Sequence, residues 1–348
     1  MMKRPLVVLL FIAASVLPGA PSMAAPWCVD AKTEQLAVLR AEVKRKILPE
    51  SRAVERVHVE GTLPHQGIYD QSVEAQLDWP VMRNLALLWQ VQREPYDLIA
   101  LSRLLTDWGN RYQPSFNPID ETKLDTYIDA FAVTRDALAP PVRSIAQRFI
   151  RKLGEGYLSR MEHNFKPNEG KWINNWNSHR VKLATLAAVA LEDEAMLARA
   201  RTHFTAHLGR NIRENGITVD FEERDALRYV VYDLEPLTRA VLAARLRGEN
   251  WLDFKGSTRA SLRNALDWLV PYAKGDKTHE EFVHSRVKFD YQRRDAGLAE
   301  FSGIWEPARS SNLYAIASIL DPKYLAISQV LKPSGSSSGG WIRACWGP

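Results

Sequence analysis

The stretch KWINNWNSHRVKLATLAAVAL (Lys171–Leu191) joins a cluster of large polar and aromatic side chains to a long apolar run. From His179 onward the apolar residues recur three and four positions apart, which predicts a helix. An asparagine at its start, Asn174 or Asn175, is typical of an N-cap, because the side-chain oxygen accepts a hydrogen bond from a free backbone N–H. The remaining polar groups either satisfy this helix or face a cavity that binds something polar.

Helical periodicity extends over most of the chain, whereas alternating runs rich in valine and isoleucine are nearly absent. Helices are therefore expected in successive pairs, joined by short links that contain Pro, Gly or Asn. Such pairs fit a bundle, a solenoid or a helical toroid around a central cavity. We predict an all-α body over residues 25–331.

The two ends of the sequence differ from this body. Residues 1–24 combine Lys3 and Arg4 with a short apolar run and small residues, as a secretory signal peptide does, so we expect a periplasmic or secreted protein. Cys28 and Cys345 then favour a disulfide between the tails, with a catalytic thiol as the rival reading. Residues 332–348 read as a flexible C-terminal tail because Gly and Ser dominate the first half of this segment.

A second polar cluster lies in RENGITVDFEERDALRYVVYDLEPL (Arg213–Leu237), where we expect a helix from about Glu222. On that helix Asp225, Arg228, Tyr229 and Tyr232 would share one face, with Arg224 at the helix start. Inward tyrosines are most often core residues. A nearby arginine favours the phenolate, however, and so suits a tyrosine that exchanges protons.

Asn175 and His179 are four residues apart, so both would project from one side of the first helix. Neither polar cluster contains HxxxH or CxxC spacing or a Gly-x-Ser-x-Gly motif, and the chain contains no Walker-type loop and no dinucleotide fingerprint. We therefore expect neither a metal site nor a cofactor. Eleven tryptophans could line a sugar cleft, although core packing is the simpler reading for most of them.

Together, INNWNSHR, the later ALRYVVYDLEPL and IWEPARSSNLYAIASIL resemble the alginate lyases of polysaccharide lyase family 5 and related uronate-polymer lyases. The resemblance is good over residues 168–240 and weaker around 300–320. It implies an α/α toroid (an incomplete barrel) of helical hairpins with a central cleft. It also implies cleavage of a polyuronate, of the alginate, mannuronan or glucuronan type, by β-elimination.

The same resemblance assigns roles to individual residues. Tyr232 matches the family's catalytic tyrosine, and Asn175 matches an asparagine that neutralises the substrate carboxylate. The family's histidine falls on Trp176, so His179, one turn later, is the expected replacement. The family's arginine falls on Asp225, which leaves Arg224 first and Arg228 second for that role. Residues expected to contact substrate are Arg228, Tyr229, Trp176 and Asn174.

Two other classes of function remain open from the residues. One is a glycan-binding protein on the same fold without catalysis, because the family's histidine is replaced. The other is an inverting hydrolase that uses two carboxylates such as Asp220, Glu222 or Asp225. In each case the expected partner is an anionic polysaccharide, with no nucleic acid and no membrane span, and the protein is expected to be a monomer.

Overall fold

The structure is a computed structural model that describes residues 33–331. The expected leader (1–24), the expected pairing of Cys28 with Cys345 and the expected tail (332–348) lie outside these residues. No helix within 33–331 has both the length and the apolar character needed to cross a membrane.

The predicted all-α class is confirmed: residues 33–331 contain helices and no strand, apart from two isolated antiparallel bridges, Ile212–Thr218 and Glu280–Ile304. The α-helices are α1 (Thr33–Lys46), α2 (Tyr69–Ala75), α3 (Asp78–Gln92), α4 (Pro95–Arg111), α5 (Asp125–Thr134), α6 (Pro140–His163), α7 (Asn175–Ala190), α8 (Glu194–Asn211), α9 (Val219–Arg224), α10 (Leu227–Arg245), α11 (Leu262–Ala273), α12 (Lys288–Asp295), α13 (Ser311–Leu320) and α14 (Leu325–Val330). Short 3-10 helices are η1 (Thr122–Leu124), η2 (Gly170–Trp172), η3 (Ala299–Phe301), η4 (Pro307–Ser310) and η5 (Pro322–Tyr324).

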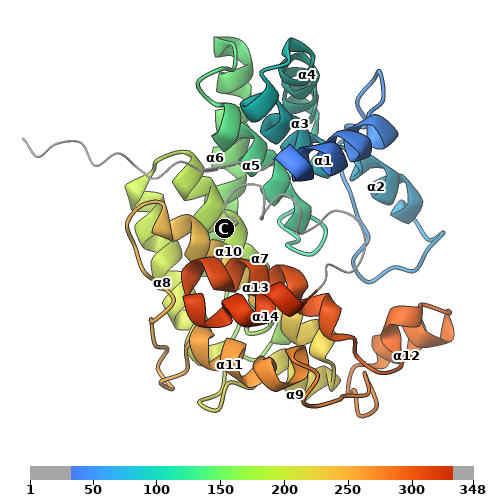
Figure 1. Ribbon diagram of the computed structural model, residues 1–348, viewed down its shortest axis with the longest axis vertical. Helices are drawn as coiled ribbons and strands as arrows, with labels where there is room; N and C mark the ends of the chain where they lie inside the picture. Colours follow the sequence, from blue (N-terminus) through green and yellow to red (C-terminus); the bar gives the residue numbers. More distant parts are fainter. Residues whose placement is uncertain (1–32, 332–348) are drawn as a thin grey trace, which may run out of the picture.

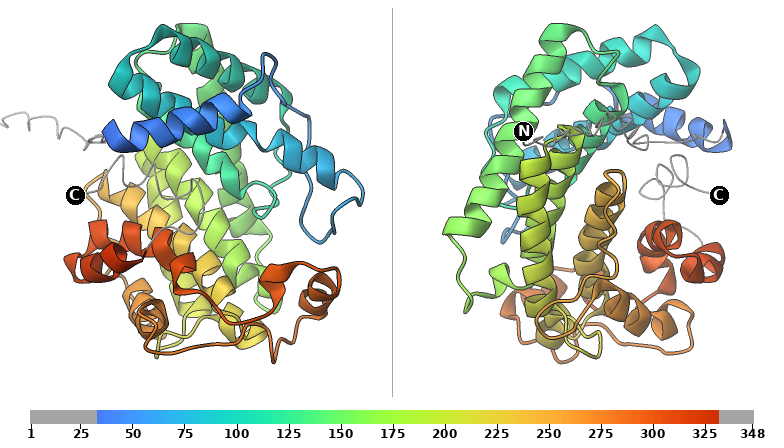
Figure 2. Two further views of the ribbon diagram at one scale, coloured as in Figure 1. Left: turned by 45° about the vertical axis from the view of Figure 1, so that its right-hand side comes forward. Right: turned by 90° about the vertical axis from the view of Figure 1, so that its left-hand side faces the viewer.

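These helices form two layers that curve together. In the inner layer α3, α5, α7, α10 and α13 pack side by side in chain order, while α4, α6 and α8 pack behind them. The ribbon follows an open arc from the N-terminal helices to α13 and α14 (Figures 1 and 2). This arrangement is the expected α/α toroid, an incomplete barrel of helical hairpins, rather than a bundle or a solenoid.

Helix α7 lies at the centre of the inner layer and explains the unbroken apolar run that follows His179. Every residue from Asn177 to Ala190 is buried, as expected for a helix that packs on all sides. Small residues let its neighbours approach: a Cβ atom added at Gly154 of α6 would lie 2.7 Å from the Cβ atom of Ala187. The sequence of α7 therefore fixes the spacing of the helices around it.

The segment after Arg213 departs from the prediction of one helix starting at about Glu222. Helix α9 ends at Arg224, Asp225 adopts a left-handed conformation (φ 50°), and α10 begins at Leu227. An aspartate tolerates this conformation better than most residues, and here its carboxylate accepts hydrogen bonds from the backbone and ring of His284. Asp225 therefore does not share the face of α10 that carries Arg228, Tyr229 and Tyr232.

Tryptophans that could have lined a sugar cleft belong instead to the core. Trp79 and Trp108 are fully buried, with ring centroids 5.2 Å apart in an edge-to-face arrangement, which is a favoured geometry for aromatic pairs. Trp172 is also buried, against the guanidinium of Arg180. The simpler reading, core packing, holds for these side chains.

Candidate active site

A cavity of about 430 Å³ lies between the inner helices and contains the two residues that the sequence singled out most strongly, His179 and Tyr232. Its walls come from α1, α2, α3, η1, α5, α7, α10 and α13. The lining residues are Glu42, Lys46, Val73, Gln76, Leu77, Pro80, Arg83, Asn84, Thr122, Lys123, Asp125, Thr126, His179, Lys182, Tyr232, Glu235, Pro236, Arg239 and Ile316. The centre of the toroid is thus a chamber lined by ionisable groups.

The orientation of His179 is set by a chain of hydrogen bonds. Lys182 Nζ donates to Thr122 Oγ1 over 2.9 Å, and Thr122 Oγ1 lies 2.6 Å from His179 Nδ1. The ammonium group only donates, and Nδ1 is the one acceptor within reach of the threonine hydroxyl hydrogen among the described residues, so the hydroxyl donates to Nδ1. The proton of the neutral imidazole therefore sits on Nε2, and that atom is buried without a partner among the described residues.

The charge state of His179 follows from its surroundings. The side chain is 3% exposed, and burial, reinforced by the charges of Lys182 and Arg180, lowers its pKa well below the usual range. Since the ring is neutral at pH 7, its Nε2–H is a preorganised, uncharged donor beside the cavity. Such a group suits the binding of a carboxylate better than the abstraction of a proton.

Tyr232 lies against this imidazole, with ring centroids 4.4 Å apart. Its hydroxyl has no hydrogen-bond partner within residues 33–331. Burial raises the pKa of Tyr232, and the charges of Arg228 and Arg293 oppose this shift. The phenol holds its proton at neutral pH, and its phenolate, once formed, is a strong base.

Pro236 shapes the turn of α10 that presents Tyr232. A proline inside a helix has no N–H, so the carbonyl of Tyr232, four residues earlier, loses its helical hydrogen bond. Pro236 also lines the cavity. The LEPL sequence after Tyr232 therefore loosens the helix where it passes the cavity.

Cations outnumber acids on the cavity wall. Lys46 and Lys123 have no ion-pair partner in the part of the chain that the structure describes. Lys182 is held by Asp125 over 2.6 Å. Arg83 and Arg239 both lie beside the buried Asp129. The chamber consequently favours an anionic ligand.

Glu235 is the exception on this wall. It lies three residues after Tyr232 on α10, and no hydrogen bond or ion pair holds its carboxylate within residues 33–331. Burial raises its pKa to about 6, although Lys182, Arg239 and Arg83 counteract the shift. Glu235 therefore changes charge within the range of pH in which many proteins work.

Asn175 and Arg224, both expected to act on the substrate carboxylate, lie outside the cavity wall. The backbone N–H of Asn175 donates to Asp220 over 2.7 Å, and its side-chain amide donates to the other oxygen of that carboxylate. Arg224 pairs with Asp290 and stacks 4.0 Å over the ring of Tyr229. Both residues have acidic partners in the protein.

The four residues expected to contact substrate also lie outside the lining of this cavity. Asn174 caps α7, accepting from the backbone N–H of Trp176 over 3.2 Å, as one of the two readings of the sequence predicted. Trp176 is half-buried, near the guanidinium of Arg180. The hydroxyl of Tyr229 accepts from Arg293 over 3.0 Å. The guanidinium of Arg228 lies 3.7 Å from Glu300.

Sequence reasoning missed several cavity residues. Lys182 and Glu235 each lie three positions after a residue that was identified, so helical spacing could have indicated them. Thr122 lies 57 positions before His179 and belongs to a short 3-10 helix, η1. Nothing near His179 in the sequence points to Thr122, because the contact depends on how η1 packs against α7.

Comparisons with known proteins agree with this architecture. The sequence model of the family described as Alginate lyase matches residues 22–279. No protein of curated function gives a significant match. Among solved structures, an alginate lyase from Bacteroides ovatus aligns with a TM-score of 0.64 at 15% identity, covering 91% of this chain and 98% of that one.

Two structures of alginate lyase A1-III are also similar in fold. The enzyme from Sphingomonas species A1 aligns with a TM-score of 0.53 at 15% identity, covering 80% of this chain and 91% of that chain. A histidine-to-alanine variant of A1-III, complexed with a tetrasaccharide, aligns with a TM-score of 0.56 at 15% identity, covering 80% and 90%. These likenesses show the same fold.

Proposed function

The chain belongs to the alginate lyase family and is a polysaccharide lyase, and from that premise we propose that its central cavity cleaves a polyuronate by β-elimination, with Tyr232 transferring the proton. The observation that carries the proposal is the convergence of His179 and Tyr232, from helices far apart in sequence, beside a cavity with excess positive charge. An anionic sugar, a fixed donor and a proton-transfer group are the parts that this reaction needs.

The first requirement is to stabilise negative charge. Removing the proton at C5 of a uronic acid is difficult because the adjacent carboxylate is already negative, and more charge moves onto it in the transition state. The Nε2–H of His179 is a fixed donor for that carboxylate, and Lys46 and Lys123 supply unpaired positive charge on the same wall. Preorganised donors of this kind lower the barrier without reorganising during the reaction.

The second requirement is proton transfer. The ionised fraction of Tyr232, which has lost its proton to solvent, is the base. Its phenolate takes the proton from C5, the electron pair of that C–H bond forms the double bond between C4 and C5, and the C4–oxygen bond breaks. The phenol so formed gives the same proton to the departing oxygen, which restores the phenolate. One group serves both steps only where the C5 proton and the C4 oxygen lie on the same face of the ring, as in mannuronate and glucuronate.

Asn175 and Arg224 contribute through the contacts they make. Asn175 ties the first turn of α7 to the buried Asp220, one turn before His179. Arg224 stacks on Tyr229, whose ring packs edge-to-face against Tyr232 at a centroid distance of 6.2 Å. Each residue thereby holds one of the two reacting side chains in place. Arg228 remains near enough to lower the pKa of Tyr232.

The substrate is a mannuronan, alginate or glucuronan type of polymer, and the leader-like residues 1–24 support action in the periplasm or outside the cell. The test is incubation of the purified protein with mannuronan, guluronan and glucuronan while near-ultraviolet absorbance of the new double bond is recorded. We expect a rise with mannuronan or glucuronan. Binding without any rise, across polymers and pH, would leave a glycan-binding role in place of catalysis.

A further inference from the structure

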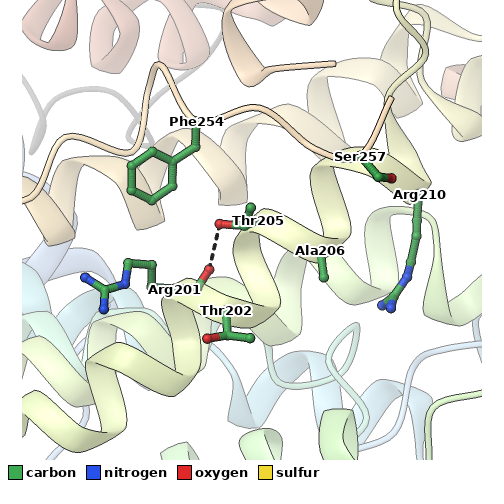
Figure 3. Close-up of a pocket in the computed structure, with 7 residues that line it drawn as sticks. All are labelled: Arg201, Thr202, Thr205, Ala206, Arg210, Phe254 and Ser257. Carbon is green, nitrogen blue, oxygen red and sulfur yellow. Dashed lines mark hydrogen bonds between the residues drawn. The ribbon is translucent and has the colours of Figure 1, made fainter. Parts of the chain in front are cut away.

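A second cavity lies on the outer layer of the toroid and shares no residue with the central one. It has a volume of about 570 Å³ and lies between α8 and the loop over residues 250–258 (Figure 3). The side chains that matter below are Arg201, Thr202, Thr205, Arg210, Phe254 and Ser257. Phe204 and His207 of α8 point into the core instead, so this groove lies on the outward face of α8.

The groove exists because two glycines bring the loop against α8. A Cβ atom added at Gly256 would lie 2.2 Å from the backbone nitrogen of Gly209, and one added at Gly209 would lie 2.7 Å from the backbone nitrogen of Ser257. No side chain fits at that contact. The close approach anchors one end of the loop, and Phe254 lies across the groove from Thr205 and Arg201 (Figure 3).

The two arginines lie near opposite ends of the groove. They are nine residues apart on α8, or roughly 14 Å along the helix axis, which is longer than one sugar ring. Arg210 has no carboxylate partner among the described residues, and its guanidinium carbon lies 4.0 Å from the centroid of the Phe165 ring. No hydrogen bond within residues 33–331 uses its N–H groups, so they are free to donate. Arg201 has one acidic neighbour, Glu249, at 3.2 Å.

The floor between the arginines supplies acceptors. The hydroxyls of Thr202 and Thr205 donate to carbonyls of their own helix, so their oxygens can act only as further acceptors. The half-buried ring of Phe254 is a flat apolar surface of the kind on which a pyranose ring stacks. Two guanidiniums, hydroxyl acceptors and one aromatic ring form a set that matches a short run of sugar acids better than a neutral glycan.

We propose that this groove is a secondary binding site for the anionic polysaccharide, which holds a distant part of the polymer while another part occupies the central cavity. The inference rests on the proposed function for the identity of the polymer. Such a site increases the local concentration of long chains at the enzyme and leaves short chains unaffected, because a short chain cannot reach both places at once.

The test uses two double variants. The groove variant carries both Arg201→Ser and Arg210→Ser, and the matched control carries both Arg111→Ser and Arg148→Ser. The control removes the same charge from two exposed arginines of α4 and α6. For the groove variant we expect KM for long polyuronate to rise severalfold, with kcat and the kinetics on a tetrasaccharide unchanged. The control should behave as the unmodified protein. Equal changes in both variants, or no change in either, would overturn the proposal.

A binding measurement separates this inference from the proposed function. In Tyr232→Phe, calorimetric titration with a polyuronate chain too short to span both sites should give two sites per protein. Adding the Arg201→Ser and Arg210→Ser changes should leave one. If the unmodified protein forms no unsaturated product but the two arginine substitutions still abolish one of two binding sites, the lyase proposal fails and the groove proposal stands. A single binding site both with and without the arginine substitutions would contradict a binding site in the groove.

Discussion

The rings of His179 and Tyr232 lie with their centroids 4.4 Å apart, although they come from α7 and α10. The two helices pack along their lengths in the inner layer, and the contact occurs where α10 carries Pro236 one turn beyond Tyr232. His179 is fixed as a neutral donor by Thr122, while the Tyr232 hydroxyl has no protein partner in the described part of the chain. His179 is therefore held in place by the protein, whereas the Tyr232 hydroxyl is available to react.

Removing the hydroxyl of Thr122 should expose the importance of that arrangement. In Thr122→Val the Nδ1 atom of His179 loses its donor, whereas Lys182 keeps its bonds to the Thr122 carbonyl and to Asp125. We expect kcat to fall by about tenfold or more, with the free energy of unfolding lowered by about 1 kcal/mol. Thr122→Ser retains the hydroxyl and should restore most of the rate. Full activity in the valine variant would contradict the hydrogen-bond chain.

Asn175→Ala should reduce stability. The substitution removes one of the two donors to the buried carboxyl of Asp220, so the free energy of unfolding should fall by about 1–3 kcal/mol. Urea unfolding followed by circular dichroism measures this change. Activity per folded molecule should also fall, because the first turn of α7 leads directly into the turn that carries His179. An equally stable Asn175→Ala with a large loss of kcat would instead place Asn175 on the substrate.

Glu235 should make substrate binding depend on pH. Its pKa of about 6 means that it is largely neutral at pH 5 and ionised at pH 7, where its charge repels a polyuronate. KM for the polymer should therefore rise between pH 5 and pH 7, and Glu235→Gln should flatten that rise. Initial rates over this range, analysed as KM and kcat separately, provide the measurement. The same KM profile in both proteins would exclude this role.

The raised pKa of Glu235 also makes the stability of the protein depend on pH. Because folding raises the pKa of Glu235 from 4.5 to about 6, the folded state holds the proton more tightly than the unfolded state. Stability contributed by this group is complete below pH 4.5 and is lost as the pH rises to about 6, with a slope of at most about 1.4 kcal/mol per pH unit. Above pH 6 the contribution is constant. Glu235→Gln should lack this slope.

A buried cluster behind the cavity predicts a second dependence on pH. Ser178 donates to Asp233 and lies 2.8 Å from His207, while Asn211 donates to the other oxygen of Asp233. Burial raises the pKa of Asp233 to about 7. Stability should thus fall as the pH rises from about 4 to about 7. Because the cluster is closed to solvent, we assign it no part in catalysis.

Asp233→Asn should remove the fall in stability between about pH 4 and about pH 7. The Asn211 side-chain oxygen, which has no hydrogen-bond partner within residues 33–331, can accept from the new amide once the Asn211 amide turns over. Urea unfolding at several pH values measures the effect, with Asp136→Asn, at an exposed position, as the control. An unchanged slope in Asp233→Asn would assign the pH dependence to another group.

The fold was largely accessible from the sequence, because helical periodicity and the residues of α7 and α10 are local signals. His179 and Tyr232 were accessible for the same reason. The predicted helix from Glu222 was wrong because the left-handed turn at Asp225 depends on hydrogen bonds with His284, far along the chain. The hydrogen bonds of Asn175 could not be predicted for the same reason, since its partner Asp220 lies 45 residues away.

The most direct test of the central claim compares Tyr232→Phe with Tyr229→Phe on the polymer that the unmodified protein cleaves. Both changes remove one hydroxyl, but only Tyr232 lines the cavity. We predict that Tyr232→Phe lowers kcat for unsaturated product by about 10²–10⁴-fold, as expected for a lost acid–base group, while the protein still binds the polymer. Tyr229→Phe should keep most of its rate. Near-normal product formation by Tyr232→Phe would contradict the mechanism.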